Sequence, residues 1–166
     1  MVKQPVRVIA EIGCNHKGDL RIAKKLIRIA AEECGADVVK FQKRCNRELL
    51  TPLEYATPHP VPGNAYGPTY GAHREFLEFD VDQHRELIET CKAHGIAYST
   101  SVWDMTSARE MVALAPGLLK IPSATNQHYE LQDYLCRHFE GEIHVSTGMS
   151  TGHEIADLVA FYEDRG

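Results

Sequence analysis

The sequence lacks any apolar run long enough to cross a membrane, and the apolar stretch in its opening segment, MVKQPVRVIAEIG, is too short for a signal peptide. It also lacks a block rich in lysine or arginine, and its formal net charge of -5 disfavours nucleic acid or an anionic membrane as a partner. The five cysteines form no C-x-x-C pair, which argues against a zinc site or a disulfide framework. We therefore expect a cytoplasmic protein with reduced thiols.

What the sequence does contain is a repeated alternation of short β-branched runs and amphipathic segments. The first strand is expected at residues 6–13 and the first helix at 19–35, where apolar residues recur at three- and four-residue steps and Asp19 suits the N-cap. The same order returns four times, with strands expected at 37–42, 96–103, 118–124 and 142–149, and helices at 80–95, 106–117, 129–141 and 151–166. The pattern predicts five βα units.

Strict βα alternation predicts a parallel sheet with right-handed crossovers, either a doubly wound sheet or a (β/α)8 barrel. Strands of a doubly wound sheet are covered on both faces and should be almost entirely apolar. Here polar residues lie near the carboxyl ends of the strands, namely Glu11, Lys40, Gln42, Thr100, Lys120 and Ser146. We therefore predict an α/β fold of the parallel (β/α)8 TIM-barrel type, incomplete, with about five units present and about three missing.

The regular spacing is interrupted after the second strand by residues 46–75, which are rich in proline, glycine and tyrosine. Long loops in compact domains are usually functional or disordered. Two alternatives therefore stay open for this segment: part of a functional site, or a mobile excursion on the surface.

Two lysines stand within otherwise apolar strands. Lys40 and Gln42 share one strand face, and Lys120 in LLKIPSA repeats the arrangement, with Ser123 following it. A buried charge needs a counter-charge or a ligand, and no equally buried acid is evident, so an external carboxylate or phosphate is predicted. The alternative is that each lysine reaches the rim or pairs with Glu11.

The stretch HVSTGMSTGHEI offers a second set of anion-binding groups. Ser146 and Thr147 precede a helix that opens with Thr151 and its capping partner Glu154, and hydroxyls and helix-start N–H groups suit phosphate oxygens. Thr100 in YSTS is a further candidate, with an ordinary buried strand threonine as its alternative.

The stretch AEIGCNHKGD places Glu11 at the end of the first strand and Asn15 and His16 in the following turn. Together these side chains could orient a polyhydroxylated substrate, although a lone loop histidine is more often merely solvated. The other eight histidines show no spacing typical of metal ligands, so no metal site is predicted within this chain.

Six motifs, in their order and spacing, resemble the sialic acid synthase family, which includes N-acetylneuraminate synthases: AEIGCNHKGDL, GADVVKFQ, YGAHREFLEF, YSTSVWD, LLKIPSA and VSTGMST. The resemblance covers essentially the whole chain. It implies a barrel that condenses phosphoenolpyruvate with an N-acetylated hexose such as N-acetylmannosamine, releasing phosphate and forming a nine-carbon 2-keto acid. Residues 1–166 would then be the N-terminal part of a single barrel domain, without its remaining units and without the C-terminal antifreeze-like domain.

The resemblance also implies roles for individual residues. Lys40 and Lys120 would hold phosphoenolpyruvate, with Thr100, Ser123, Ser146 and Thr147 as substrate-binding residues. Glu11 and Gln42 would face the sugar, with Asn15 and His16 in the supporting loop. The family's divalent metal, manganese or magnesium, would polarise the sugar aldehyde, and its histidine ligands would lie on strands beyond the fifth. A homodimer is a further expectation.

One motif departs from the family pattern, because IPSATNQ supplies Ala124 and Thr125 where the family commonly has S-G-E or S-G-D. That departure concerns contacts on the substrate side. Two other functions remain open from the residues alone. One is a Schiff-base aldolase that uses Lys40 or Lys120 as its nucleophile. The other is a half-barrel binding or assembly module that covers its open sheet edge with another copy.

Overall fold

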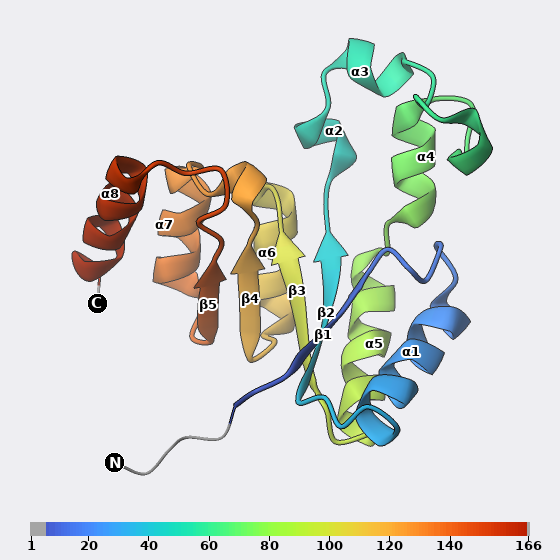
Figure 1. The fold of residues 1–166 in the computed structure, drawn as a ribbon, viewed down its shortest axis with the longest axis horizontal. Coiled ribbons are helices and arrows are strands. Elements are labelled where there is room, and N and C mark those ends of the chain that lie inside the picture. The colour runs from blue at the N-terminus through green and yellow to red at the C-terminus, as the bar shows by residue number, and fades with distance from the viewer. Residues whose placement is uncertain (1–5, 166) are drawn as a thin grey trace.

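The computed structural model describes residues 6–165, which form a five-stranded parallel sheet flanked by helices (Figure 1). The strands are β1 (Ile9–Gly13), β2 (Val38–Lys43), β3 (Ala97–Val102), β4 (Leu118–Ile121) and β5 (Glu142–Val145). The helices that follow them are α1 (Leu20–Glu32), α5 (Val81–Ala93), α6 (Met105–Leu114), α7 (Tyr129–His138) and α8 (Gly152–Glu163). The five predicted βα units are therefore confirmed, while Gly166, the expected end of the last helix, lies outside the described residues.

The strand order is β1-β2-β3-β4-β5, so every strand pairs with its neighbours in sequence. A doubly wound sheet instead reverses its order at a switch point, which sends helices to both faces. Successive right-handed crossovers in one direction place all helices on a single face, as in a barrel. The order therefore favours the barrel type over the doubly wound alternative.

The hydrophobic core lies between the sheet and these helices. Val39 and Phe41 of β2 pack with α1 and α5, and Leu119 and Ile121 of β4 pack with α6 and α7; all four side chains are fully buried. Burying such side chains contributes about 1.5–3 kcal/mol each to folding. Because strand side chains alternate, the other face carries the polar residues, including Lys40 and Gln42.

The sheet is curved toward this polar face. Five flat strands would place the two edge strands roughly 19 Å apart. Yet Ile9 and Glu11 of β1 line the same cavity as Ile143 and Val145 of β5. Curvature therefore turns the polar face into a concave surface, with the helices on its convex side.

Residues 46–75 form ordered secondary structure instead of an irregular loop. The segment contains α2 (Asn46–Leu49), α3 (Pro52–Ala56), the 3-10 turn η1 (Pro62–Asn64) and the start of α4 (Tyr70–Leu77). Thr51 and Glu54 form a capping box at the start of α3, and the ring of Tyr55 packs directly on Gly71. Figure 1 shows these helices beyond the carboxyl end of β2. Capping and the Tyr55 contact explain why the segment is helical; its function stays a prediction.

Candidate functional site

The concave face of the sheet holds a cavity of about 670 Å³ near the carboxyl ends of the strands. Its lining brings together five of the residues singled out in the sequence, Glu11, Lys40, Lys120, Ser146 and Thr147. They come from β1, β2, β4 and the segment after β5, so curvature of the sheet and the parallel register assemble the site.

Lys40 is the most buried charge of the cavity, with 10% of its side chain exposed. It is ion-paired with Glu11, whose side chain is 49% exposed, and its Nζ lies 3.4 Å from Ser101 Oγ. Pairing with Glu11, the alternative raised from the sequence, is therefore present. Because Glu11 remains accessible to solvent, an incoming anion can compete with its carboxylate for the ammonium group.

Lys120 is partly buried and differs from Lys40 in its partners. Its neighbours in register are Ser101 on β3 and His144 on β5, and neither is an acid. Across residues 6–165, no carboxylate forms an ion pair with Lys120. The cavity therefore carries a positive charge that the described part of the chain does not balance, as an anion-binding site requires.

Gln42 connects this charge pair to the rim. Its Nε2 donates to Glu11 Oε1 at 3.1 Å, and its Oε1 accepts a hydrogen bond of 2.8 Å from Trp103 Nε1. The guanidinium of Arg44 lies 5.6 Å from the centre of the Trp103 ring. These bonds hold both ends of the Gln42 amide, which orients it beside Glu11 as a hydrogen-bonding group for a polar ligand.

The segment after β5 supplies hydroxyl groups. Gly148 N lies at 3.5 Å from Ser146 Oγ, and a side chain at Gly148 would meet Ser123, so Ser123 adjoins this edge of the cavity. Asn126, which sequence reasoning missed, is buried and donates to Ser146 O and to Ser150 Oγ, each at 2.8 Å. Its amide fixes the loop that presents the serines.

The start of α8 is less available to an anion than the sequence suggested. Thr151 Oγ1 accepts from Glu154 N at 3.3 Å, and Glu154 Oε2 accepts from Thr151 N at 2.7 Å. The capping box is confirmed, and it already uses two of the donors expected to hold phosphate.

Thr100 lies on the opposite face of the sheet, which corrects its prediction as a substrate contact. In register it stands opposite Phe41, on the side packed by helices, and it is fully buried. Lys40 stands opposite Ser99, so alternation turns Ser99 and Ser101 toward the concave face. The hydroxyl near Lys40 is that of Ser101, one residue beyond the predicted one.

His16 and Asn15 do not line the cavity, and the burial of His16 argues against its predicted contact with the substrate. His16 is only 3% exposed, and its ring stacks on Phe79 with 4.1 Å between ring centroids. Burial lowers the pKa of His16 to about 4, and its Nδ1 accepts from Gly18 N at 3.1 Å. Asn15 is exposed, and neither residue lines the cavity. His16 therefore packs the loop onto the helix side as a neutral ring.

Comparison with known proteins shows which family the chain belongs to. A model of the NeuB family matches residues 26–166 of the chain. The chain belongs to the NeuB family. This agrees with the resemblance to sialic acid synthases that the motifs carry.

Two curated relatives of this NeuB-family chain are a neuraminate-phosphate synthase and a legionaminic acid synthase. It is 38% identical over 132 residues to N-acetylneuraminate-9-phosphate synthase of Homo sapiens, an alignment covering 76% of this chain and 35% of the relative. It is 33% identical over 152 residues to N,N'-diacetyllegionaminic acid synthase of Campylobacter jejuni, covering 92% and 45%. The chain therefore spans less than half the length of these curated relatives.

A solved structure supports the fold. The crystal structure of N-acetylneuraminic acid synthetase from Leptospira borgpetersenii, in complex with citrate, matches with a TM-score of 0.80 at 23% sequence identity. The match covers 98% of this chain and 51% of that one. Together with the strand order, this confirms the predicted (β/α)8 TIM-barrel type of fold.

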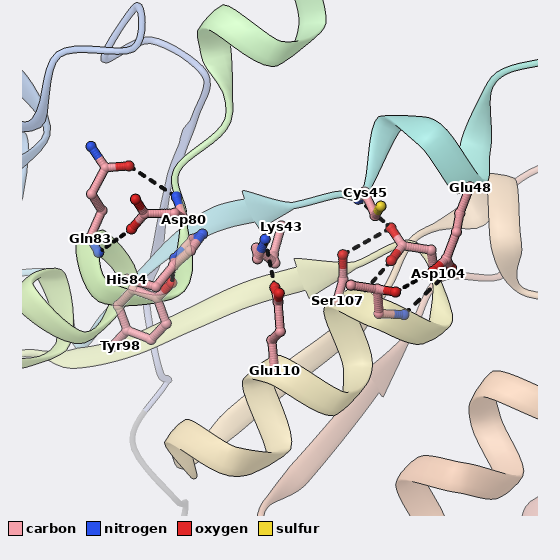
Figure 2. A network of polar contacts seen from close by, with 11 residues as sticks. Lys43, Cys45, Glu48, Asp80, Gln83, His84, Tyr98, Asp104, Ser107 and Glu110 are labelled. Carbon is pink, nitrogen blue, oxygen red and sulfur yellow. Dashed lines mark hydrogen bonds and ion pairs between the residues drawn. The ribbon is translucent and has the colours of Figure 1, made fainter. Parts of the chain in front are cut away.

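In this NeuB-family chain β2 carries a second buried lysine, Lys43, whose charge is balanced by a carboxylate on the helix side of the sheet. Lys43 faces the helices and pairs with Glu110 of α6 at 2.7 Å (Figure 2). In the same region Asp104 accepts from Cys45 N at 2.7 Å and from Ser107 Oγ at 2.8 Å. This network joins the end of β2 to α6 and lies outside the cavity, so Lys43 is not a substrate candidate.

The metal implied by the resemblance finds no donor set in the part of the chain that the structure describes. Among residues 6–165, no group of three histidine, cysteine, aspartate or glutamate side chains is arranged to hold a metal ion. The side chains of residues 6–165 therefore do not fit a divalent metal ion. Nor is any helix of this part long and apolar enough to span a bilayer.

Proposed function

We propose that this chain provides the anion-binding side of a synthase that condenses phosphoenolpyruvate with an N-acetylated hexose of the N-acetylmannosamine type. The observation that carries the proposal is the charge of the cavity. Among residues 6–165 Lys120 has no carboxylate partner, and Lys40 pairs with the solvent-accessible carboxylate of Glu11. Membership of the NeuB family supports the choice of substrates. A cytoplasmic location and a homodimer remain predictions.

The ligand has two negatively charged groups, a carboxylate and a phosphate, and the cavity has two ammonium groups for them. Charge-assisted hydrogen bonds from Lys40 and Lys120 would neutralise these groups, with Ser146, Thr147 and Ser123 supplying hydroxyls. Binding both ends of phosphoenolpyruvate orients its reactive face, which is the main contribution that such residues make to rate.

Glu11 and Gln42 would hydrogen-bond the sugar beside the enolpyruvate. In the proposed reaction C3 of phosphoenolpyruvate attacks the aldehyde carbon of the open-chain sugar. Water then adds at C2, and phosphate leaves by cleavage of the C2–O bond, which gives the 2-keto acid. In this scheme the lysines balance charge on the enol substrate while the Glu11–Gln42 pair, joined at 3.1 Å, positions the acceptor.

The test is binding of phosphoenolpyruvate, measured by titration calorimetry, to the chain and to Lys40→Met and Lys120→Met. Each substitution removes one charged donor while keeping an unbranched side chain, and we expect about tenfold weaker binding from each. Lys92→Met is the matched control, because Lys92 is 67% exposed on α5 and, within residues 6–165, pairs only with Glu89. Unaltered affinity in both cavity variants, with folding intact by circular dichroism, would exclude the proposed function.

The aldolase alternative is separated by chemistry. Incubation with pyruvate and borohydride would reduce and trap a Schiff base on Lys40 or Lys120 if either acted as a nucleophile. Under the proposed function neither lysine is labelled, as judged by the mass of the intact chain.

A further inference from the structure

His144 lies in the cavity wall and opens the stretch HVSTGMSTGHEI, but it has no role among the predicted anion-binding groups or in the proposed function. It is on the concave face of β5, where its Cα is the register partner of Lys120, and its side chain is 37% exposed. The imidazole is therefore next to the lysine that lacks a carboxylate partner and within the space that an anion would occupy.

The His144 ring contacts the carboxylate of Glu142, and Arg7 forms an ion pair with the same carboxylate. His144 Nε2 lies 2.6 Å from Glu142 Oε1, and Arg7 Nη2 lies 2.7 Å from Glu142 Oε2. Hydrogen bonds from Arg7 and then His144 lower the pKa of Glu142, so this carboxylate stays ionised. Arg7 Nη2 is also 3.4 Å from His144 Nε2.

The contacts of Nε2 leave the other ring nitrogen for the cavity. Across residues 6–165, Nδ1 has no hydrogen-bond partner. With Nε2–H donated to Glu142, neutral His144 presents only a lone pair at Nδ1, which an anion avoids. Protonation converts Nδ1 into an N–H donor and adds a positive charge, and both changes favour an anion.

Some of the charged groups that face His144 favour protonation of its ring, and others disfavour it. Glu142 on its own strand favours the protonated ring, whereas Arg7 and Lys120 disfavour it. Across the cavity, Lys40 and Glu11 largely cancel each other as an ion pair. A divalent oxyanion beside Nδ1 would add negative charge and so favour the protonated form.

We propose that His144 is a third anion-binding group of this cavity, one that contacts a phosphate-like oxyanion only when protonated, so that binding takes up a proton. The proposal rests on the proposed function for the identity of the natural ligand, a phosphate ester. Under this proposal the affinity for phosphoenolpyruvate depends on pH, because His144 of β5 must be protonated to contact the anion.

Sulfate is the suitable probe, because it is a tetrahedral dianion whose charge is constant between pH 5.5 and pH 8.5, whereas phosphate itself titrates there. Sulfate affinity would be measured by titration calorimetry across this range at constant ionic strength. For the wild-type chain we expect about a tenfold loss of affinity between pH 5.5 and pH 8.5, because deprotonation of the ring removes one charge-assisted donor.

His144→Gln keeps a polar side chain but cannot take up the proton, and we expect its sulfate affinity to be weak and constant with pH. Glu142→Gln removes the group that favours the proton, so the loss of affinity should move to lower pH. His153→Gln is the matched control, because His153 is 88% exposed on α8 and lies outside the cavity. It should behave as the wild type does.

A flat profile in the wild-type chain, or a wild-type profile in His144→Gln, overturns the proposal. The two proposals fail separately. If the lysine variants lose phosphoenolpyruvate while the sulfate profile is flat, the proposed function stands and the role of His144 does not. If the profile depends on His144 while the lysine variants bind phosphoenolpyruvate normally, His144 belongs to an anion site with another ligand.

Discussion

Lys40 and Lys43, three residues apart on β2, point to opposite faces of the sheet and meet different carboxylates. Lys40 faces the cavity and pairs with the half-exposed Glu11, whereas Lys43 faces the helices and pairs with Glu110. An odd spacing along a strand places side chains on opposite faces, so one buried lysine serves the site and the other serves packing.

Replacing these two lysines should separate binding from stability. We expect Lys43→Met to lower the free energy of unfolding by about 2 kcal/mol, because it leaves Glu110, 70% covered by protein, without its partner. Affinity for phosphoenolpyruvate should stay within about twofold of the wild type. Urea unfolding and titration calorimetry on Lys43→Met and Lys40→Met check this, and a greater loss of binding in Lys43→Met would contradict the assignment.

Stability should depend on pH through His84, which is fully buried on α5, with Tyr98 OH 2.5 Å from its Nδ1 (Figure 2). Burial lowers the pKa of His84 to about 3. The unfolded chain therefore binds a proton below about pH 6.5 that the folded chain does not bind until about pH 3. Stability from this group is present above pH 6.5 and is lost as pH falls, by up to about 1.4 kcal/mol per pH unit.

His84→Phe isolates this effect. His16 contributes in the same direction, since its pKa is also lowered, whereas the raised pKa values of Glu78 and Asp104 act in the opposite direction. The difference between wild type and variant removes these shared contributions. Between pH 7 and pH 5 the wild type should lose about 2 kcal/mol more than His84→Phe in urea unfolding. If the free energy of unfolding depends on pH equally in the two proteins, His84 takes up its proton at the same pH in the folded and the unfolded chain, and the prediction is wrong.

Gly18 closes the loop after β1 against α4, and its substitution should be costly. Its φ is +74°, and an added Cβ would overlap the carbonyl oxygen of Phe76. Gly18→Ala should therefore cost about 2–4 kcal/mol of unfolding free energy, from backbone strain plus overpacking. Urea unfolding measures the loss.

Two other glycines separate the cost of backbone strain from the cost of overlap with Phe76. Gly35 also has a positive φ, +63°, but nothing lies within 4 Å of an added Cβ, so Gly35→Ala should cost only about 1–2 kcal/mol. Gly63 has neither feature, and Gly63→Ala should change stability by no more than about 0.5 kcal/mol. Equal losses in Gly18→Ala and Gly35→Ala would mean that the contact with Phe76 is unimportant.

Sequence patterns were sufficient wherever the interaction is local. Helix periodicity located the five helices that follow the strands, and Asp19 and Thr151 were identified as N-caps because capping joins residues two or three positions apart. Alternation along a strand likewise placed Lys40 and Gln42 on one face. His144 could have been found in the same way, two residues before Ser146 on the face that carries Lys120.

Long-range contacts could not be read in this way. Whether Thr100 or Ser101 faces the cavity depends on the register between β3 and β2, which a one-residue shift reverses. The burial of His16 depends on Phe79, far along the chain, and the carboxylate that meets Lys40 comes from β1. Neither partner leaves a periodic signal near the residue that it contacts.

The sequence by itself therefore determined the βα alternation, the barrel type of fold and the lysines and hydroxyls from which an anion site could be built. Local hydrogen bonding and side-chain alternation set those features, and both are visible as short periods. Only the tertiary structure decided which of these groups share the cavity and which charges remain unbalanced. Register, sheet curvature and burial settle those questions, and each arises from packing between segments distant in sequence.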